Sequence, residues 1–336
     1  MRLAKRGLLL AACAAALISV SAGARAQSWT DIVAAAKKEG KLVLYSATVP
    51  ALLNRLRIDF EAANPGIQME VARMDSGPML PRLDMERQTG ADGADMMIST
   101  ELGWLARREA EGALRKPSGP DVDNWPKQFL SDGGVAVLAL EPLILAYNTD
   151  SLKTPVTSFQ DLLRPDLRGR IGTSTLAATT LIAWYDWLEQ TQGPDFLAKF
   201  AAQKPKLYAG AVGNTQSLAS GEIVATAFTN TSVSLPMIDQ GAPIKLVYPN
   251  PGFGIRYGAG ILAWGKHPNA SLVAMNYFMS RRGQTTWAGP GGVASPLPNI
   301  PNTLDARTIT PFDPLKYPPE AVKAYTEKWN KLFLAQ

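Results

Sequence analysis

The order of apolar and polar residues along the chain predicts strands that alternate with helices. Lys41–Ser46 is a short apolar run typical of a buried parallel strand, and apolar residues from Leu53 to Phe60 then recur at helical spacing. Residues 67–74 and 94–99 predict two further strands. Such alternation favours a parallel sheet wrapped by helices. The helices expected in this part of the chain span 29–39, 53–64, 76–90 and 101–111.

The pattern changes at residue 135, where an extended apolar run continues to Tyr147 and is interrupted by Glu141 and Pro142. We expect a strand of this length to pass from one lobe to another, and residues 255–264 predict a second crossing strand. Shorter elements alternate elsewhere: strands at 170–172, 206–209, 223–228 and 244–248, and helices at 179–190, 214–219 with Asn214 as N-cap, 235–240, 270–281 and 321–334.

The first 26 residues predict a secretory signal peptide that is cleaved after Ala26. Basic residues precede an apolar run at Leu8–Val20, and the small residues Ala24 and Ala26 stand where a signal peptidase reads. The apolar run is too short for a permanent membrane-spanning helix. An alternative reads Leu10–Cys13 as a lipoprotein processing site, in which case Cys13 would be lipidated rather than removed.

Removal of this leader changes the charge of the protein. The whole chain has 34 basic and 29 acidic residues, but four basic residues and no acidic ones fall in the leader, which leaves a mature chain of 30 basic and 29 acidic residues. A net charge near +1 gives no electrostatic basis for binding nucleic acid or an anionic membrane. The remaining length of about 310 residues favours two lobes over a single core.

A set of short segments, taken in order, carries a resemblance to a known family. The segments are 42–46, 64–67, 94–99, 146–149, 158–163, 167–171, 218–222 and 263–270, followed by 274–284. They resemble the periplasmic substrate-binding proteins of ABC transporters, in the branch that includes ferric-ion, polyamine, thiamine and phosphonate binders. Each segment alone is weakly specific, but together they cover nearly all of the mature chain.

The resemblance implies an α/β, two-lobed periplasmic-binding-protein fold of type II, with a mostly parallel, helix-wrapped sheet in each lobe and two crossing strands as the hinge. It implies a signal peptide at 1–26, a first lobe of residues 27–140 and 255–295, and a second lobe of residues 141–254 and 296–336. Such a protein closes its lobes over a small solute. It then delivers the solute to an inner-membrane ABC permease with its ATPase, and we expect a periplasmic monomer.

Hydroxyl-bearing and small residues follow the predicted strands, where an open α/β lobe presents strand ends and helix N-termini to a ligand. Ser, Thr and Asn are also favoured as helix caps in any protein, so each residue has an alternative structural role. The candidate ligand-binding residues are Ser46, Thr48, Ser76, Gly77, Glu101, Glu141, Thr175, Thr179, Asn214, Thr231, Arg256 and Tyr257.

Three ligand chemistries follow from these candidates. Arg256 can clamp a carboxylate or phosphate, which favours an anionic organic solute. Glu141 and Glu101 could instead bind an amine or polyamine, although Glu141 could equally pair with Arg256. Ferric binders of the family carry two adjacent tyrosines where this chain has Thr231 and Ser232. A trivalent metal needs anionic oxygen ligands of that kind, so ferric binding is disfavoured.

The sequence gives no support for an enzyme. It contains no nucleophile elbow, no P-loop and no paired Cys or His at metal-ligand spacing, and its one histidine, His267, lies in a plain turn. We therefore expect no catalytic residue, no metal and no cofactor. A secreted scaffold or sensor partner without transport stays open as a third function.

Overall fold

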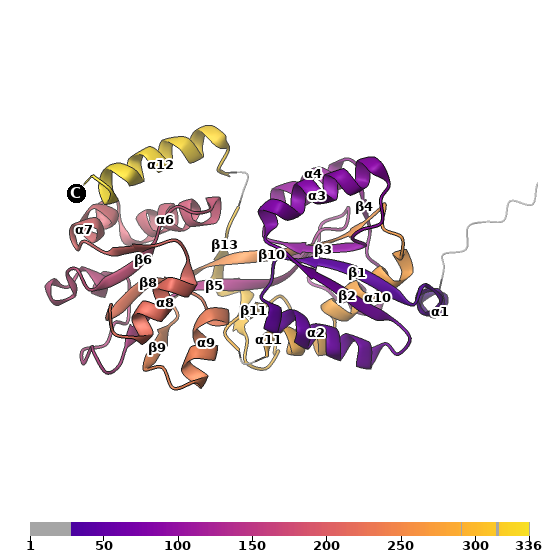
Figure 1. The fold of residues 1–336 in the computed structure, drawn as a ribbon, viewed down its shortest axis with the longest axis horizontal. Coiled ribbons are helices and arrows are strands. Elements are labelled where there is room, and N and C mark those ends of the chain that lie inside the picture. Colours follow the sequence, from indigo (N-terminus) through magenta and orange to yellow (C-terminus); the bar gives the residue numbers. More distant parts are fainter. Residues whose placement is uncertain (1–27, 290, 314–315, 336) are drawn as a thin grey trace, which may run out of the picture.

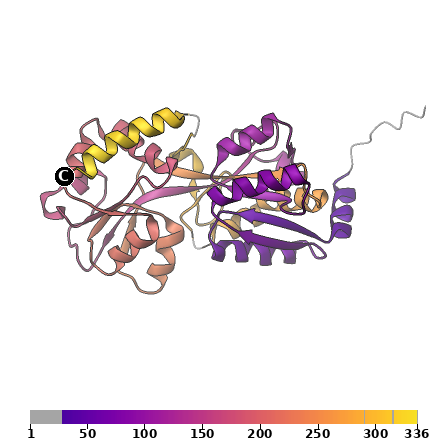
Figure 2. The same ribbon diagram turned by 45° about the horizontal axis from the view of Figure 1, so that its top comes forward.

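The computed structural model describes residues 28–289, 291–313 and 316–335. The signal peptide predicted at 1–26, including Cys13, lies outside the described residues. Two helix-flanked halves stand side by side and are joined by the long strands β5 and β10, which run between them (Figures 1 and 2). These two strands are β5 (Ala136–Asn148) and β10 (Gly252–Leu262).

The helices match most of those that the apolar spacing predicted. The first begins with a capping box between Ser28 and Asp31 and ends at Gly40, which adopts a left-handed conformation with φ of 75°. In chain order the α-helices are α1 (Trp29–Glu39), α2 (Pro50–Ala63), α3 (Ser76–Thr89), α4 (Leu102–Ala110), α5 (Pro120–Asp123), α6 (Thr179–Gln192), α7 (Phe196–Ala202), α8 (Ala211–Ala219), α9 (Thr231–Asp239), α10 (Pro268–Met279), α11 (Arg281–Ala288) and α12 (Pro319–Phe333).

The strands form one continuous sheet with the order β2-β1-β3-β10-β5-β8-β6-β7 along its main path. The pairs β1–β2, β1–β3, β6–β7 and β6–β8 are parallel, whereas β10 is antiparallel to both β3 and β5. The remaining strands are β1 (Lys41–Ser46), β2 (Gln68–Arg73), β3 (Met96–Ser99), β4 (Leu114–Arg115), β6 (Ile171–Ser174), β7 (Lys206–Tyr208), β8 (Ala225–Thr229), β9 (Ile244–Val247), β11 (Ala294–Ser295), β12 (Leu304–Asp305) and β13 (Ile309–Pro311).

Helices cover both faces of the sheet in each half. In Figure 1, α3 and α4 lie on one face of the first half and α2, α10 and α11 on the other, while α6, α7 and α12 lie opposite α8 and α9 in the second half. This arrangement confirms the predicted α/β fold of the type II periplasmic binding proteins.

Two large apolar cores, one in each half, explain why the molecule has two lobes. The larger cluster around Phe60 and Phe278 draws on α2, α10 and strands β1, β3 and the first part of β5. The second surrounds Trp184 and Tyr185, both fully buried, and takes in Leu143 and Leu145 of β5. The change of core along β5 falls between Leu140 and Leu143, next to Glu141. The lobe boundaries proposed at 140/141, 254/255 and 295/296 stay a prediction.

Two sequence-based expectations about local structure were wrong, and one helix was not predicted. Helix α8 begins at Ala211 with Gly210 as its N-cap, so Asn214 lies within the helix rather than capping it. Helix α9 begins at Thr231 rather than Leu235, with the Asn230 side chain accepting a hydrogen bond from the Val233 amide. The stretch after α10 forms a separate helix, α11, capped by the Ser280 hydroxyl.

Candidate ligand-binding site

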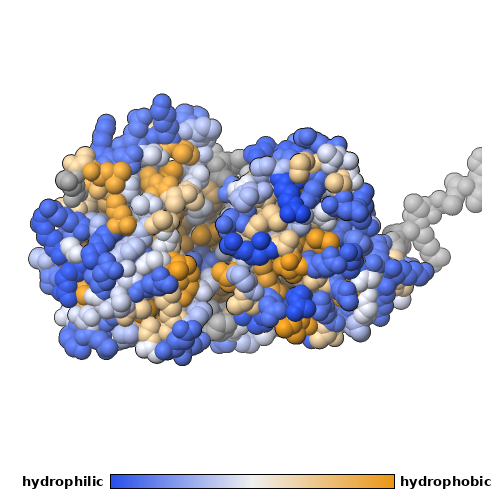
Figure 3. Space-filling view, viewed as in Figure 1, coloured by the Kyte–Doolittle hydropathy of each residue, from blue (hydrophilic) through white to orange (hydrophobic). Residues whose placement is uncertain are grey.

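A small cavity of about 90 Å³ lies where the two halves meet. Its lining comes from five places: the start of α2 with the preceding loop, the middle of β5, the first turns of α9, Tyr257 of β10, and the end of α11 with the loop that follows. The groove between the two halves is visible on the face of the molecule in Figure 3. Because α2 and α9 belong to different halves, a solute held here would touch both.

The N-terminus of α2 forms one side of this cavity. Its N-cap, Val49, offers no side-chain hydrogen bond to the first turn, and both Val49 and Ala51 line the cavity. The preceding Thr48 is buried, and its hydroxyl is 2.9 Å from that of Ser46. The first amides of a helix have no intrahelical partner, so α2 presents partial positive charge at this wall.

The N-terminus of α9 forms the opposite side. Thr231, the first residue of the helix, is 1% exposed, and its hydroxyl oxygen has no hydrogen-bond partner among the described residues. A buried polar atom without a partner is costly, so a water or a ligand that bonded to this hydroxyl would relieve that cost. Gly292, in the loop after α11, packs so closely on Thr231 that an added Cβ would lie 2.6 Å from the Thr231 Cβ.

Glu141 closes the floor of the cavity. The backbone amide and the hydroxyl of Ser232 both donate to its Oε1, and the Tyr257 hydroxyl donates to Oε2 across 2.9 Å. Burial raises the pKa of the Glu141 carboxyl above its ordinary value of 4.5, although these hydrogen bonds act in the opposite direction. Burial also raises the pKa of the Tyr257 phenol, with the nearby Glu141 carboxyl acting in the same direction.

The alternative in which Glu141 pairs with Arg256 does not agree with the strand register. Glu141 lies opposite Ile255, and Arg256 lies opposite Leu140. Burial lowers the pKa of the Arg256 guanidinium, and the charge of Asp313 offsets only part of this effect. The partners that the structure gives Glu141 are Ser232 and Tyr257.

Arg55, on the second turn of α2, brings positive charge to the cavity. Its Nε donates to the Thr286 carbonyl at 2.8 Å and its Nη2 to the Trp287 carbonyl at 3.2 Å, so it caps the end of α11. Burial lowers the pKa of this guanidinium, but an arginine stays charged at any physiological pH.

The cavity brings together four of the twelve candidate residues, namely Thr48, Glu141, Thr231 and Tyr257. The other eight do not line it. Ser46 lies behind Thr48, Ser76 bonds with Ser99, and Gly77 and Glu101 are exposed at the starts of α3 and α4. Thr175 and Thr179 are half-buried around the start of α6. The roles of all twelve in solute binding stay predictions.

Sequence reasoning missed Arg55 and Trp287. Arg55 follows the first strand by nine residues, but a helical position alone does not say which way its side chain faces. The stretch after α11 is rich in glycine, with Gly289, Gly291 and Gly292 close together. Glycines often occur where another part of the chain approaches the backbone closely, and here Gly292 lies against Thr231.

Asn214 has a structural position that the sequence did not indicate. It is fully buried, and its amide donates to the Thr226 hydroxyl at 2.8 Å and to the Phe228 carbonyl at 2.7 Å. Gly172 leaves room for its side chain, because a Cβ there would collide with the Asn214 Oδ1.

We expect Asn214→Ala to lower the free energy of unfolding by about 2 kcal/mol, since it leaves a buried carbonyl and hydroxyl without this donor. Urea denaturation measures the change, and Gln216→Ala, at an exposed position of the same helix, is the control. Unchanged stability together with lost solute binding would contradict this structural role and favour direct ligand contact.

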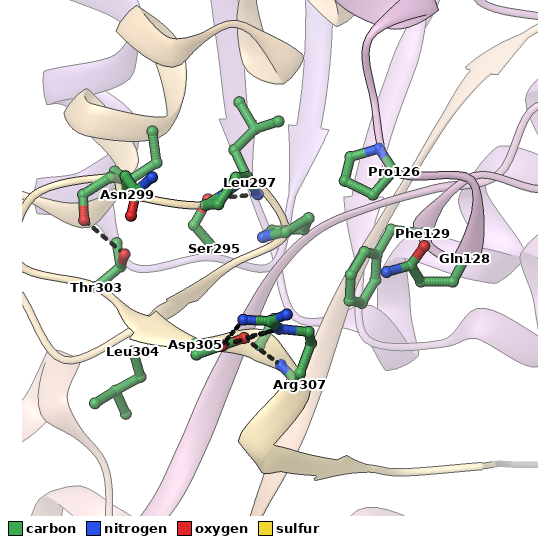
Figure 4. Close-up of a pocket in the computed structure, with 14 residues that line it drawn as sticks. Pro126, Gln128, Phe129, Ser295, Leu297, Asn299, Thr303, Leu304, Asp305 and Arg307 are labelled. Atoms are coloured by element: carbon green, nitrogen blue, oxygen red, sulfur yellow. Dashed lines mark hydrogen bonds and ion pairs between the residues drawn. The ribbon is translucent and has the colours of Figure 1, made fainter.

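A larger cavity of about 410 Å³ lies elsewhere, between Pro126–Phe129 and the segment from Ser295 to Arg307. Figure 4 shows Pro126 and Phe129 on one side of it and the Asp305–Arg307 ion pair below. Its residues include none of the twelve candidates, and several of them pack on the first apolar core alone. The smaller cavity is therefore the better candidate for a site that both lobes share.

Two features are absent from the residues that the structure describes. No group of three or more His, Cys, Asp or Glu side chains is arranged to hold a metal ion in this part of the chain. Among the same residues, no helix has the length and apolar character needed to cross a bilayer.

Comparison with known proteins identifies the family. The model of the bacterial extracellular solute-binding protein family matches residues 42–291. A search of curated proteins gave no match.

Solved structures share the fold at low sequence identity. The substrate-binding protein of an ABC transporter from Agrobacterium tumefaciens has a TM-score of 0.72 at 18% identity, covering 89% of this chain and 96% of that one. AfuA of Actinobacillus pleuropneumoniae, solved with fructose-6-phosphate, has a TM-score of 0.67 at 19% identity over 89% and 100% of the chains. Iron-bound HitA of Pseudomonas aeruginosa has a TM-score of 0.65 at 19% identity over 86% and 99%.

The family match covers well over half of the chain. Proteins of this family are the periplasmic or extracellular receptors of ABC transporters, which bind a small solute for a permease and catalyse no reaction. The chain belongs to the family of bacterial extracellular solute-binding proteins.

Proposed function

We propose that this protein is a monomeric periplasmic receptor that captures a small anionic organic solute, bearing a carboxylate or a phosphate, in the cavity between α2 and α9. It then presents the solute to an inner-membrane ABC permease driven by its ATPase. The observation that carries the proposal is the meeting of two helix N-termini, one from each half, at a single cavity. Helix N-termini favour anions through the helix dipole, and at α2 also through first-turn amides that no side-chain cap engages. At α9 the Ser232 and Val233 amides already donate to Glu141 and Asn230, so the dipole and the Thr231 hydroxyl are what this helix offers.

Two side chains support the same reading. Arg55 adds a full positive charge to the wall beside α2, and the Thr231 hydroxyl offers an unused donor at the start of α9. Glu141 would repel an anion if it were ionised. Burial raises the pKa of its carboxyl, which widens the pH range in which the group is neutral and does not repel an anion.

Neighbours in the fold were solved with ligands of different chemistry. AfuA was solved with fructose-6-phosphate, and HitA was solved with iron. The two positions that match the tyrosine pair of the ferric binders are Thr231 and Ser232, both on the cavity wall. Neither is an anionic oxygen ligand of the kind that ferric ion prefers, so ferric binding is disfavoured.

A receptor for an amine is the second candidate, because the Glu141 carboxyl faces the cavity. Glu101, its expected partner in that role, is exposed at the start of α4 and does not line the same cavity. An ionised Glu141 would then have to balance the charge of the amine alone.

Thermal-shift screening against organic acids, phosphonates, sugar phosphates, polyamines and ferric salts tests the proposal. We expect an anion to stabilise the protein by about 2.7 kcal/mol at one hundred times its dissociation constant. Stabilisation by polyamines or ferric ion, with no response to any anion, would contradict it.

Arg55→Gln should weaken binding of that anion about tenfold, because it removes the charge from the cavity wall. Arg57→Gln is the matched control, since Arg57 lies on the same helix but pairs with Glu61 and Asn54. Isothermal titration at low and high salt measures both. Equal affinities for the two variants would remove Arg55 from the site.

A further inference from the structure

The walls of the candidate cavity are more apolar than a site for a sugar or another polyol would require. Leu52 of α2, Leu235 and Pro236 of α9, and Val293 all line it. Trp287 of α11 completes this wall and is 2% exposed. Leu52, Val293 and Trp287 also belong to, or pack against, the apolar core of the first half. The apolar wall is thus continuous with that core, and its shape is fixed by it.

The polar atoms on the lining are mostly engaged with one another. Thr48 bonds with Ser46, while Ser232 and Tyr257 both bond with Glu141. Two nitrogens of Arg55 donate hydrogen bonds to carbonyls of α11. Among the described lining residues, the Thr231 hydroxyl is the buried side-chain oxygen without a partner.

An apolar wall with one unpartnered hydroxyl suits a solute that has a single polar end. A polyol would have to leave several hydroxyls unpaired against Leu52, Leu235 and Val293, and each unpaired buried group costs free energy. The volume of about 90 Å³ also favours a compact ligand, since sites for drug-sized molecules span roughly 300 to 1,000 Å³.

The polar end fits a carboxylate better than a phosphate. One charged side chain, Arg55, stands beside the cavity, and the Glu141 carboxyl already occupies the Ser232 donors at the start of α9. A carboxylate carries one charge and two oxygens, whereas a phosphate brings up to two charges and needs more donors.

We infer that the solute is a small monocarboxylate with a compact apolar body, its carboxylate at the start of α9 beside Thr231 and its body between Leu52, Leu235 and Trp287. This inference rests on the proposed function and narrows it to one ligand class. It separates this chain from AfuA, whose solved complex contains a sugar phosphate.

The test compares ligands of matched size by isothermal titration of the mature protein. Butanoate is the apolar monocarboxylate, trihydroxybutanoate adds hydroxyls to the same skeleton, butanamide removes the charge, and inorganic phosphate and glucose 6-phosphate represent the other anions. We expect butanoate to bind at least about tenfold more tightly than trihydroxybutanoate, because an apolar pocket disfavours an added hydroxyl by up to about a hundredfold. Butanamide should bind weakly.

Two variants locate the ligand within the cavity. Leu235→Asn should weaken butanoate binding about tenfold by removing apolar contact, and Thr231→Val should weaken it by removing the unused donor. Met237→Asn, on the same helix but away from the cavity lining, is the control for helix stability.

The outcomes separate this inference from the function on which it rests. Tighter binding of trihydroxybutanoate or of a phosphate, or no binding of butanoate, would overturn the inference and leave an anion receptor in place. Binding of amines with no response to any anion would overturn the proposed function itself. Equal effects of Leu235→Asn and Met237→Asn would overturn the placement of the apolar body.

Discussion

Replacing Gly292 with alanine is expected to lower solute affinity by roughly a hundredfold, or about 2.7 kcal/mol. Gly292 has φ of +85°, and a Cβ there would lie 2.6 Å from the Cβ of Thr231 and would also collide with its Cγ2. Gly292 follows α11, whose Trp287 belongs to the first core, whereas Thr231 begins α9 in the other half. The added methyl group should therefore hold the two halves apart at the cavity.

The control for this substitution is Gly241→Ala. Gly241 has φ of +92°, so alanine meets the same backbone strain there, but a Cβ would find no atom within 4 Å. Solution X-ray scattering with saturating ligand should give a larger radius of gyration for Gly292→Ala than for Gly241→Ala. Equal affinities and equal radii would show that the approach of Gly292 to Thr231 does not govern closure.

Glu141→Gln is expected to raise the stability of the ligand-free protein at neutral and alkaline pH, and to remove the pH dependence of solute binding. Burial raises the pKa of the Glu141 carboxyl above 4.5. The stability that this group contributes is therefore complete below the unfolded-state pKa and is lost as pH rises through the higher folded-state pKa. The advantage of glutamine should grow by about 1.4 kcal/mol for each pH unit between the two values.

The effect on binding has the same origin. As pH rises, ionisation of Glu141 adds negative charge to the cavity, so affinity for an anion should fall in the wild type and stay level in Glu141→Gln. Arg55 keeps its charge throughout, and the raised pKa of Tyr257 keeps that phenol neutral in this window. An amine receptor would behave in the opposite way, because its affinity would rise with pH and Glu141→Gln would abolish it.

Glu86→Gln provides the matched control. Glu86 is also a buried carboxyl, 4% exposed, and accepts a hydrogen bond of 2.8 Å from the Tyr45 hydroxyl. It does not line the candidate cavity. Titrations of ligand affinity from acid to alkaline pH should change in Glu141→Gln and match the wild type in Glu86→Gln. A pH profile shared by all three proteins would exclude Glu141 from the site.

Local signals predicted the first half of the fold well. The Ser28 capping box, the Gly40 stop and the apolar spacing of α2 all act within one or two turns, so the sequence alone displays them. The start of α8 was misplaced because the decisive contact is distant. Asn214 looks like an N-cap in sequence, but its amide satisfies Thr226 and Phe228 on β8, which no local pattern reveals.

The residues of the candidate site were likewise predicted only in part. Thr48 and Thr231 were found because each follows a strand, which is where α/β lobes present ligand contacts. Arg55 and Trp287 were missed because their place in the cavity depends on α2 packing against α11. Arg256 was proposed as a ligand-binding residue because of its charge. Its position opposite Leu140 places it on the other face of the strand pair from Glu141.

A crystal structure of the protein purified with its natural solute tests the central claim most directly. We predict density for an anionic group within hydrogen-bonding distance of Thr231 or the first turn of α2, enclosed by residues of both halves. Density confined to the cavity beside Asp305 and Arg307, or a solute bound to one half alone, would contradict this account.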